Sequence, residues 1–150
     1  MSTLLIVHHT PSPGAHAMFE AVRSGAGDDA IEGVDVVVRP ALAATAVDVL
    51  AADAYVLGTP ANIGYMSGAL KHFFDQIYYP CLDATQRRPY ALYVHGNSDT
   101  GGAIRAVETI VTGLQWRQVC APLSVLGQPG RAELDACYEL GATVAANLLT

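Results

Sequence analysis

Five short apolar segments, separated by stretches with the periodicity of amphipathic helices, constrain the fold of this chain most strongly. Two of them, "LLIV" at 4–7 and "VDVVV" at 34–38, are continuous runs that barely alternate with polar residues. Strands that are covered on both faces have this pattern, as in parallel sheets. We therefore expect five strands, at Thr3–His8, Val34–Arg39, Ala54–Gly58, Tyr90–His95 and Val119–Val125.

Between and after these strands, apolar residues recur at intervals of three and four, which places them on one face of a helix. A shorter helix is expected over 46–51. Strands that alternate with helices, joined by right-handed crossovers, predict an α/β fold with a doubly wound parallel sheet and helices on both faces. The apolar faces of the four longer helices consist of Met18, Phe19 and Val22; Leu70, Phe73, Phe74 and Ile77; Ile104, Val107, Val111 and Leu114; and Leu134, Cys137, Tyr138, Gly141, Ala145 and Leu148.

Length and charge restrict the class of protein. A chain of 150 residues suits a single domain over 1–150. The net charge of -6 argues against a nucleic-acid partner, because a phosphate backbone binds a basic face. No apolar run reaches the roughly 18 residues of a membrane span, and the first residues lack the positive start of a secretory signal. We therefore expect no membrane span and a cytoplasmic location.

Neither a disulfide framework nor a metal site is expected. The three cysteines, Cys81, Cys120 and Cys137, are odd in number and form no C-x-x-C pair. His8 and His9 are adjacent on a strand, so their side chains point to opposite faces and do not converge on one ion.

Three loops have an unusual composition. Ligands of doubly wound sheets bind beyond the carboxyl ends of the strands, where the strand order reverses. The loops after the first, third and fourth strands are "HTPSPGAH" at 9–16, "TPANIGYM" at 59–66 and "GNSDTGG" at 96–102. All are rich in glycine, proline, hydroxyls and amides and carry almost no charge. These loops therefore form the expected site.

The first loop has the character of an anion site. Thr10 and Ser12 offer hydroxyls, and the amides of Gly14, Ala15 and His16 open the first helix. Free N–H groups and the positive end of the helix dipole attract a phosphate there. A purely structural interpretation stays open, because an N-cap serine followed by proline at the first helical position is a good capping signature by itself.

The other two loops suit a flat ring attached to such a phosphate. Asn62 and Asn97 offer neutral polar groups for the edge of a ring. Either Ile63 or Tyr65 would lie against its face.

Other catalytic motifs are absent or incomplete. The first loop has one glycine instead of G-x-G-x-x-G, and no Walker sequence occurs. "GNSDT" resembles a nucleophile elbow, but all five histidines precede Ser98, whereas a hydrolase triad needs a later one. Cys81 and Arg87 have the spacing of a cysteine phosphatase. Their segment leads from a helix into a strand, so no helix N-terminus lowers the thiol pKa.

The segment "GTPANIGYMSGALKHFFDQIYY" at 58–79 resembles the flavodoxin-like superfamily, and within it the NAD(P)H-dependent FMN reductase and quinone oxidoreductase branch. "HHTPSPGAHAMFEAV" and "VHGNSDTGG" resemble that superfamily's phosphate loop and third flavin loop less specifically. The similarity covers essentially the whole chain and implies a five-stranded sheet of order 2-1-3-4-5. The matching pattern, P-x-x-x-G-x-M-x-x-x-L-K-x-F-x-D, falls on Pro60, Gly64, Met66, Leu70, Lys71, Phe73 and Asp75.

The resemblance also implies a set of FMN-binding residues. No side chain need act as acid or base, because the flavin carries the chemistry, so we expect no catalytic residue. One departure is that Pro11 and Pro13 remove two N–H donors from the phosphate loop, which predicts weaker FMN binding. The implied residues are Thr10, Ser12, Gly14, Ala15 and His16 for the phosphate; Pro60, Ala61, Asn62, Ile63, Gly64 and Tyr65 along the isoalloxazine; and Gly96, Asn97, Ser98, Gly101 and Gly102 at its other edge.

The function implied by this resemblance is that of an FMN-dependent NAD(P)H oxidoreductase. Such an enzyme passes a hydride from NADPH or NADH to FMN and on to a small acceptor such as a quinone or a flavin. Members of this branch often form homodimers, so the resemblance leaves a homodimer or homotetramer open. Two alternatives stay open: a flavodoxin-type electron carrier, and a flavodoxin-like domain that has lost FMN binding.

Overall fold

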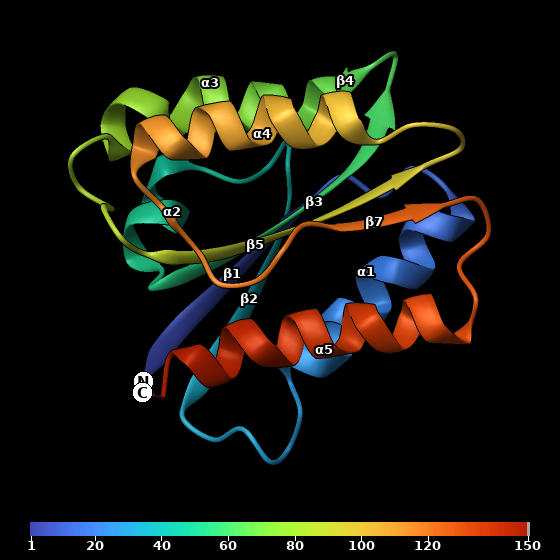
Figure 1. Ribbon diagram of the computed structural model, residues 1–150. Helices are drawn as coiled ribbons and strands as arrows, with labels where there is room; N and C mark the ends of the chain where they lie inside the picture. The colour runs from blue at the N-terminus through green and yellow to red at the C-terminus, as the bar shows by residue number, and fades with distance from the viewer. Residues whose placement is uncertain (150) are drawn as a thin grey trace.

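A parallel β-sheet lies between two layers of helices in the computed structural model, which describes residues 1–149 (Figure 1). The sheet runs in the order β2-β1-β3-β5, and two short strands, β6 and β7, pair with the outer edge of β5. The expected fold class and strand order are therefore confirmed. The main strands are β1 (Ser2–His8), β2 (Val34–Pro40), β3 (Ala54–Asn62), β5 (Pro89–Gly96), β6 (Arg117–Gln118) and β7 (Leu123–Leu126).

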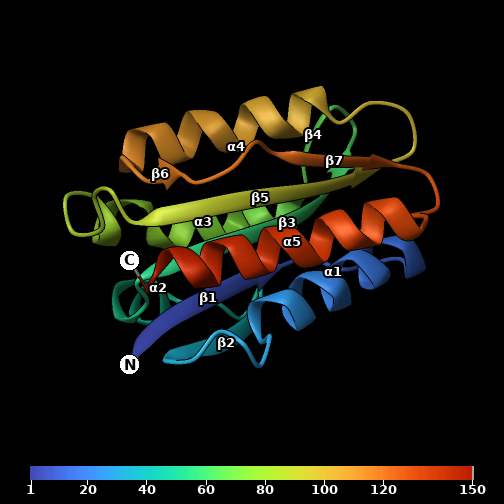
Figure 2. The ribbon, with the colours of Figure 1, turned by 60° about the horizontal axis from the view of Figure 1, so that its bottom comes forward.

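Helices cover both faces of the sheet, as Figures 1 and 2 show. Helices α1 (Pro13–Ala26) and α5 (Arg131–Asn147) pack on one face, and α2 (Ala46–Ala51), α3 (Gly68–Cys81) and α4 (Gly101–Leu114) pack on the other. The residues of the "LLIV" run are at most 1% exposed, because alternate side chains enter the two cores. This double coverage explains the continuous apolar run of β1, whereas β2, at the edge of the sheet, is only partly buried.

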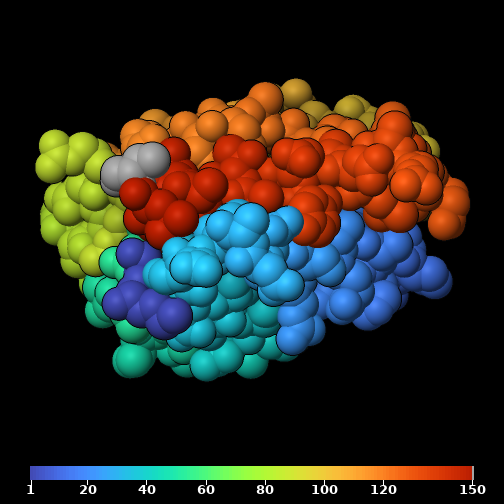
Figure 3. Space-filling view, turned by 90° about the horizontal axis from the view of Figure 1, so that it is seen from below, coloured from blue at the N-terminus to red at the C-terminus, as the bar shows by residue number. Residues whose placement is uncertain are grey.

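Helices α1 and α5 make a close contact. Figure 3 shows α5, in orange and red, beside the blue segments of α1 and the chain that follows it. A Cβ atom added at Gly141 would lie 2.1 Å from the carbonyl oxygen of Val22, so only glycine fits at this crossing. Tyr138 of α5 also donates a hydrogen bond to Asp28, just beyond the end of α1.

The third strand is longer than predicted. We expected it to end at Gly58, but it continues past Pro60, a residue type that normally interrupts a strand. In the structure, β1 pairs with β3 only as far as Gly58, whereas β5 continues to pair with it up to Pro60. Pro60 therefore lies on an edge, where a missing N–H group is tolerated. The chain then turns back into β4 (Tyr65–Met66), which is antiparallel to β3.

The fifth strand, predicted as continuous from Val119 to Val125, is interrupted. It consists of β6 and β7, and residues 119–122 leave the ladder between them. The amide of Val119 still donates to the carbonyl of Tyr90, but Pro122 has no N–H group with which to continue the pairing.

No helix within residues 1–149 is long and apolar enough to cross a membrane. The same residues contain no group of three or more histidine, cysteine, aspartate or glutamate side chains with the arrangement of a metal site.

Candidate functional site

The first loop, residues 9–12, leads from β1 into α1 and caps this helix. The Oγ of Ser12 accepts a hydrogen bond from the amide of Ala15 at 3.2 Å, and the Ser12 carbonyl accepts one from the amide of His16 at 2.9 Å. Pro13 occupies the first helical position. The capping interpretation is thus confirmed, and the cap uses two of the three helix amides that we expected to face an anion.

Several donors of this loop stay available. Within the described residues, the amides of Thr10, Ser12 and Gly14 donate to no protein atom. The Ser12 hydroxyl accepts from Ala15, so its own proton is free to donate outward. The segment 9–16 contains no carboxylate, and the positive end of the α1 dipole adds to the attraction for an anion.

The second loop is a tight β-hairpin between β3 and β4. Asn62 pairs with Tyr65, and the two residues between them have positive φ angles, 50° at Ile63 and 74° at Gly64. The Ile63 side chain is fully exposed and that of Tyr65 is 41% exposed. The hairpin therefore presents an apolar tip at the carboxyl edge of the sheet.

Buried hydroxyl groups hold the base of this hairpin. The amide of Ser67 donates to Thr59 Oγ1 at 3.0 Å, and the Thr59 hydroxyl donates to the carbonyl of Pro60 at 2.8 Å. The Oγ of Ser67 accepts from the amide of Leu70 at 3.2 Å and so caps α3. These hydrogen bonds fix the end of β3 and the start of α3, and the hairpin tip lies between these two elements.

The third loop, residues 97–100, joins β5 to α4. Asn97, Ser98 and Asp99 are exposed, and the Asp99 carboxylate accepts a hydrogen bond from the amide of Gly101 at 2.9 Å. The hydroxyl oxygens of Thr100 and Ser124 are 2.5 Å apart, which ties this loop to β7. The side chains of Asn97 and Ser98 are left free to contact a ligand.

The structure brings the second and third loops into direct contact. A Cβ atom at Gly102 would lie 2.0 Å from the carbonyl oxygen of Gly64, so the start of α4 packs against the turn of the hairpin. One at Gly96 would lie 3.4 Å from the Cβ of Ala61. Figure 2 shows β4 beside the start of α4. The glycines expected here thus permit close backbone contact.

The first loop contacts a fourth loop that the sequence analysis missed. A Cβ atom at Gly14 would lie 2.9 Å from the imidazole of His95 and 3.4 Å from Pro129. The Nε2 atom of His95 donates to the carbonyl of Gly127 at 2.8 Å. Residues 127–130, "GQPG", follow the carboxyl end of β7, and this position together with their glycines and proline was the signal available in the sequence.

The expected site residues differ in accessibility. Buried members can contribute backbone groups or shape, whereas exposed ones can contact a ligand through their side chains. Gly14, Ala15, Pro60 and Gly96 are buried; Thr10, Ser12, Ala61, Gly101 and Gly102 are half-buried; and His16, Asn62, Ile63, Gly64, Tyr65, Asn97 and Ser98 are exposed.

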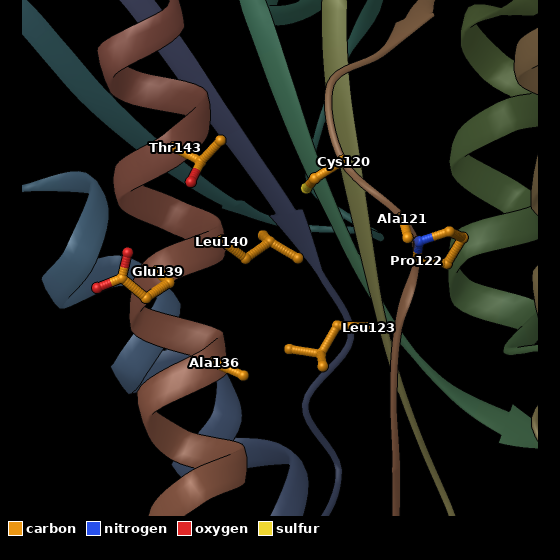
Figure 4. Close-up of a pocket in the computed structure, with 8 residues that line it drawn as sticks. All are labelled: Cys120, Ala121, Pro122, Leu123, Ala136, Glu139, Leu140 and Thr143. Carbon is orange, nitrogen blue, oxygen red and sulfur yellow. The ribbon is translucent and has the colours of Figure 1, made fainter.

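A separate groove lies at the edge of the sheet, between α5 and the interrupted fifth strand (Figure 4). Its volume is about 490 Å³. Leu123 and Leu140 point toward each other across it, while the carboxylate of Glu139 points away. None of the expected site residues lines this groove.

Comparison with known proteins links the chain to flavoproteins. A curated flavodoxin from Aquifex aeolicus (strain VF5) is 35% identical over 77 residues, which is 51% of this chain and 40% of the relative. The matched segment thus spans less than half of that relative.

Solved structures share the fold at low sequence identity. A flavodoxin from the domain Archaea has a TM-score of 0.85 and 19% identity, and the match covers 99% of both chains. The flavodoxin WrbA-like protein from Agrobacterium tumefaciens has a TM-score of 0.77 and 21% identity, over 98% of this chain and 97% of the other. The Flv1 flavodiiron core from Synechocystis has a TM-score of 0.82 and 14% identity, over 99% of this chain and 36% of the other.

A family model described as NADPH-dependent FMN reductase matches residues 25–127. This segment includes the hairpin and the third loop but not the first loop, where the two prolines lie. The match covers more than half of the chain, and the superfamily resemblance seen in the sequence is confirmed. The chain therefore belongs to the NADPH-dependent FMN reductase family and has a flavodoxin-like fold.

Proposed function

We propose that this protein binds FMN at the carboxyl edge of its sheet and is an NAD(P)H-dependent flavin oxidoreductase. The observation that carries the proposal is that three donor-rich loops with almost no charge follow the strands at this edge, the second and third in direct contact, in a chain that belongs to a family of FMN reductases. FMN, when bound, supplies the ability to accept a hydride and pass its electrons on.

The first loop fits the phosphate of FMN. Three amides that find no acceptor among residues 1–149, at Thr10, Ser12 and Gly14, are combined with a hydroxyl whose proton is free. A doubly charged phosphate is stabilised by such donors at a helix N-terminus, even where no lysine or arginine is present. In this proposal Ala15 and His16 shape the loop, because the Ser12 cap engages their amides.

The other two loops fit the ring. The exposed side chains of Ile63 and Tyr65 offer an apolar face, and Asn97 and Ser98 offer polar groups for its edge. In this proposal, these residues bind and orient the flavin, and none of them transfers a proton. The catalytic contribution of the protein is then to place the flavin where a nicotinamide and a small acceptor can approach it.

A carrier function is the second candidate, and the matched segment of the curated flavodoxin supports it. The two functions differ in turnover. An enzyme oxidises NADPH or NADH continuously when a quinone or free flavin is supplied, whereas a carrier without turnover does not.

The experiment has two stages. Purified protein is first titrated with FMN, and quenching of flavin fluorescence measures the dissociation constant. NADPH and NADH oxidation are then followed at saturating FMN with a quinone acceptor. Binding with steady oxidation above that of free FMN supports the enzyme, and binding without it supports the carrier. Failure to bind FMN at saturating concentration would contradict both and leave a flavodoxin-like domain without its cofactor.

A further inference from the structure

His8 ends β1, immediately before the first loop, and its imidazole is held in a defined orientation. The ring stacks on Phe19 of α1, with centroids 3.9 Å apart and an interplanar angle of 21°. Its Nδ1 atom lies 2.6 Å from the Oγ1 atom of Thr10. The stack and the hydrogen bond together place this imidazole against the proposed phosphate loop.

The position of one proton decides what Thr10 can offer to an anion. If Nδ1 of His8 is protonated, it donates to Thr10 Oγ1, and the hydroxyl proton of Thr10 is free to donate outward. If Nδ1 is unprotonated, the Thr10 hydroxyl donates its proton to Nδ1, and only the lone pairs of Thr10 Oγ1 face an incoming phosphate. The neighbouring Ser12 already has the first arrangement, because its Oγ accepts from the amide of Ala15.

The surroundings of His8 favour the neutral imidazole as long as no anion is near. Burial is the main cause that lowers its pKa. The paired residues on the flanking strands, Pro40 on β2 and Gly58 on β3, do not titrate. The remaining charged or titratable neighbours are His9, Arg23 and His16, which lower the pKa further, and Glu20, which raises it.

A phosphate dianion beside His8 would raise the pKa of its imidazole, because a nearby negative charge favours the imidazolium. The segment 9–16 contains no lysine or arginine that could supply this charge instead. Protonation would add a positive charge at the loop and would leave Nδ1 protonated in every case, because both ring nitrogens of an imidazolium carry a proton, so the Thr10 proton would always be free to donate outward.

We propose that His8 is a positioning residue for the phosphate of FMN, acting through Thr10, and that phosphate binding is coupled to proton uptake by its imidazole. This inference rests on the proposed FMN site. Its consequence is that the affinity for FMN, relative to that for riboflavin, rises as the pH falls through the pKa of His8 in the complex. Riboflavin has no phosphate and therefore does not share the effect.

The test measures the FMN and riboflavin dissociation constants by fluorescence quenching between about pH 8.5 and pH 6.5, above the second phosphate pKa of about 6. Three proteins are compared: the wild type, His8→Asn and His72→Gln. The asparagine amide can still donate to Thr10 but takes up no proton. His72 is exposed on α3 and serves as the matched histidine control.

In the wild type and in His72→Gln, the ratio of FMN affinity to riboflavin affinity should rise about threefold or more across this range. The upper limit is about tenfold for each unit by which the phosphate raises the His8 pKa. In His8→Asn the ratio should stay nearly constant. His8→Phe, which keeps a ring to stack on Phe19, replaces His8→Asn if circular dichroism shows that the latter does not fold.

The outcomes separate the two proposals. FMN binding with the same pH dependence in His8→Asn as in the wild type, or with no pH dependence in the wild type, would overturn the role of His8 and leave the FMN site intact. An absence of FMN binding in every variant at every pH would overturn the proposed function, and this inference with it.

Discussion

Ile63 lies in a conformation that its side chain does not favour. It is β-branched and has a φ of 50°, in a two-residue turn where asparagine is the preferred residue before glycine. Its side chain is also fully exposed, so burial does not compensate for the strain. Strain of this kind is retained where another requirement maintains it, and contact with the flavin ring is the requirement that we propose.

Replacing Ile63 by asparagine should therefore raise the stability of the protein and lower its affinity for FMN. Ile63→Asn should raise the free energy of unfolding by about 1 kcal/mol, because asparagine tolerates the left-handed conformation. It should weaken FMN binding about threefold to tenfold, because apolar contact with the ring is lost. Urea unfolding and fluorescence titration measure the two effects. Ile63→Val, which keeps both the branching and the apolar surface, should change neither; a stabilised Ile63→Asn with unaltered FMN affinity would contradict the role of the tip.

Gly102 is required by the contact between α4 and the hairpin. Gly102→Ala would place a Cβ atom 2.0 Å from the carbonyl oxygen of Gly64, so one of the two loops must move. We expect a loss of about 1–3 kcal/mol in the free energy of unfolding, together with weaker FMN binding. Gly68→Ala is the matched control, because a Cβ atom there meets nothing within 4 Å. Equal stability of the two variants would show that the hairpin is not held against α4.

The role that we propose for His8 could not be predicted from the sequence. The five histidines were visible, but the stack on Phe19 and the bond to Thr10 depend on how α1 packs against β1. The same holds for His95, whose contact with Gly14 joins residues far apart in the chain.

At the scale of elements, the sequence predicted best where one physical requirement dominates. The four apolar residues of the first strand must be apolar because both faces are covered, and the run is therefore clear. Prediction failed where two signals compete. Pro60 and Gly58 suggest a strand end, yet the partner β5 extends the strand beyond them. Pro122 lies in an apolar run that otherwise has the pattern of one strand.

We expect the hydrogen bond between Tyr138 and Asp28 to make the contact between α1 and α5 depend on pH. The hydrogen bond from Tyr138 lowers the pKa of the Asp28 carboxyl below its usual value. Since the folded pKa is depressed, the stabilisation is present at neutral pH and is lost as the pH falls through about 4 and below.

Tyr138→Phe should therefore be less stable than the wild type at pH 7, and the difference should shrink toward pH 3. Thermal unfolding at both pH values measures it. Tyr79→Phe is the matched control, because Tyr79 is 80% exposed and its hydroxyl has no hydrogen-bond partner in the described part of the chain. A Tyr138→Phe difference that is independent of pH would show that Asp28 is not the group responsible.

At the scale of the whole molecule, the fold and the family are in agreement with the sequence. The alternation of strands and helices was sufficient to predict the doubly wound sheet, and the motif at 58–79 was sufficient to identify the superfamily. The first loop lies outside the matched family segment, and its cap engages two of the three helix amides that we expected to face an anion.

The central claim is that the amides of Thr10, Ser12 and Gly14 hold the FMN phosphate while the hairpin and the third loop hold the ring. Backbone amide NMR spectra recorded during titration with FMN, and separately with riboflavin, test it most directly. We predict that FMN shifts these three amides and those of the two ring-binding loops, whereas riboflavin shifts only the latter. Unchanged first-loop amides at saturating FMN, or shifts confined to the groove between α5 and the interrupted fifth strand, would contradict it.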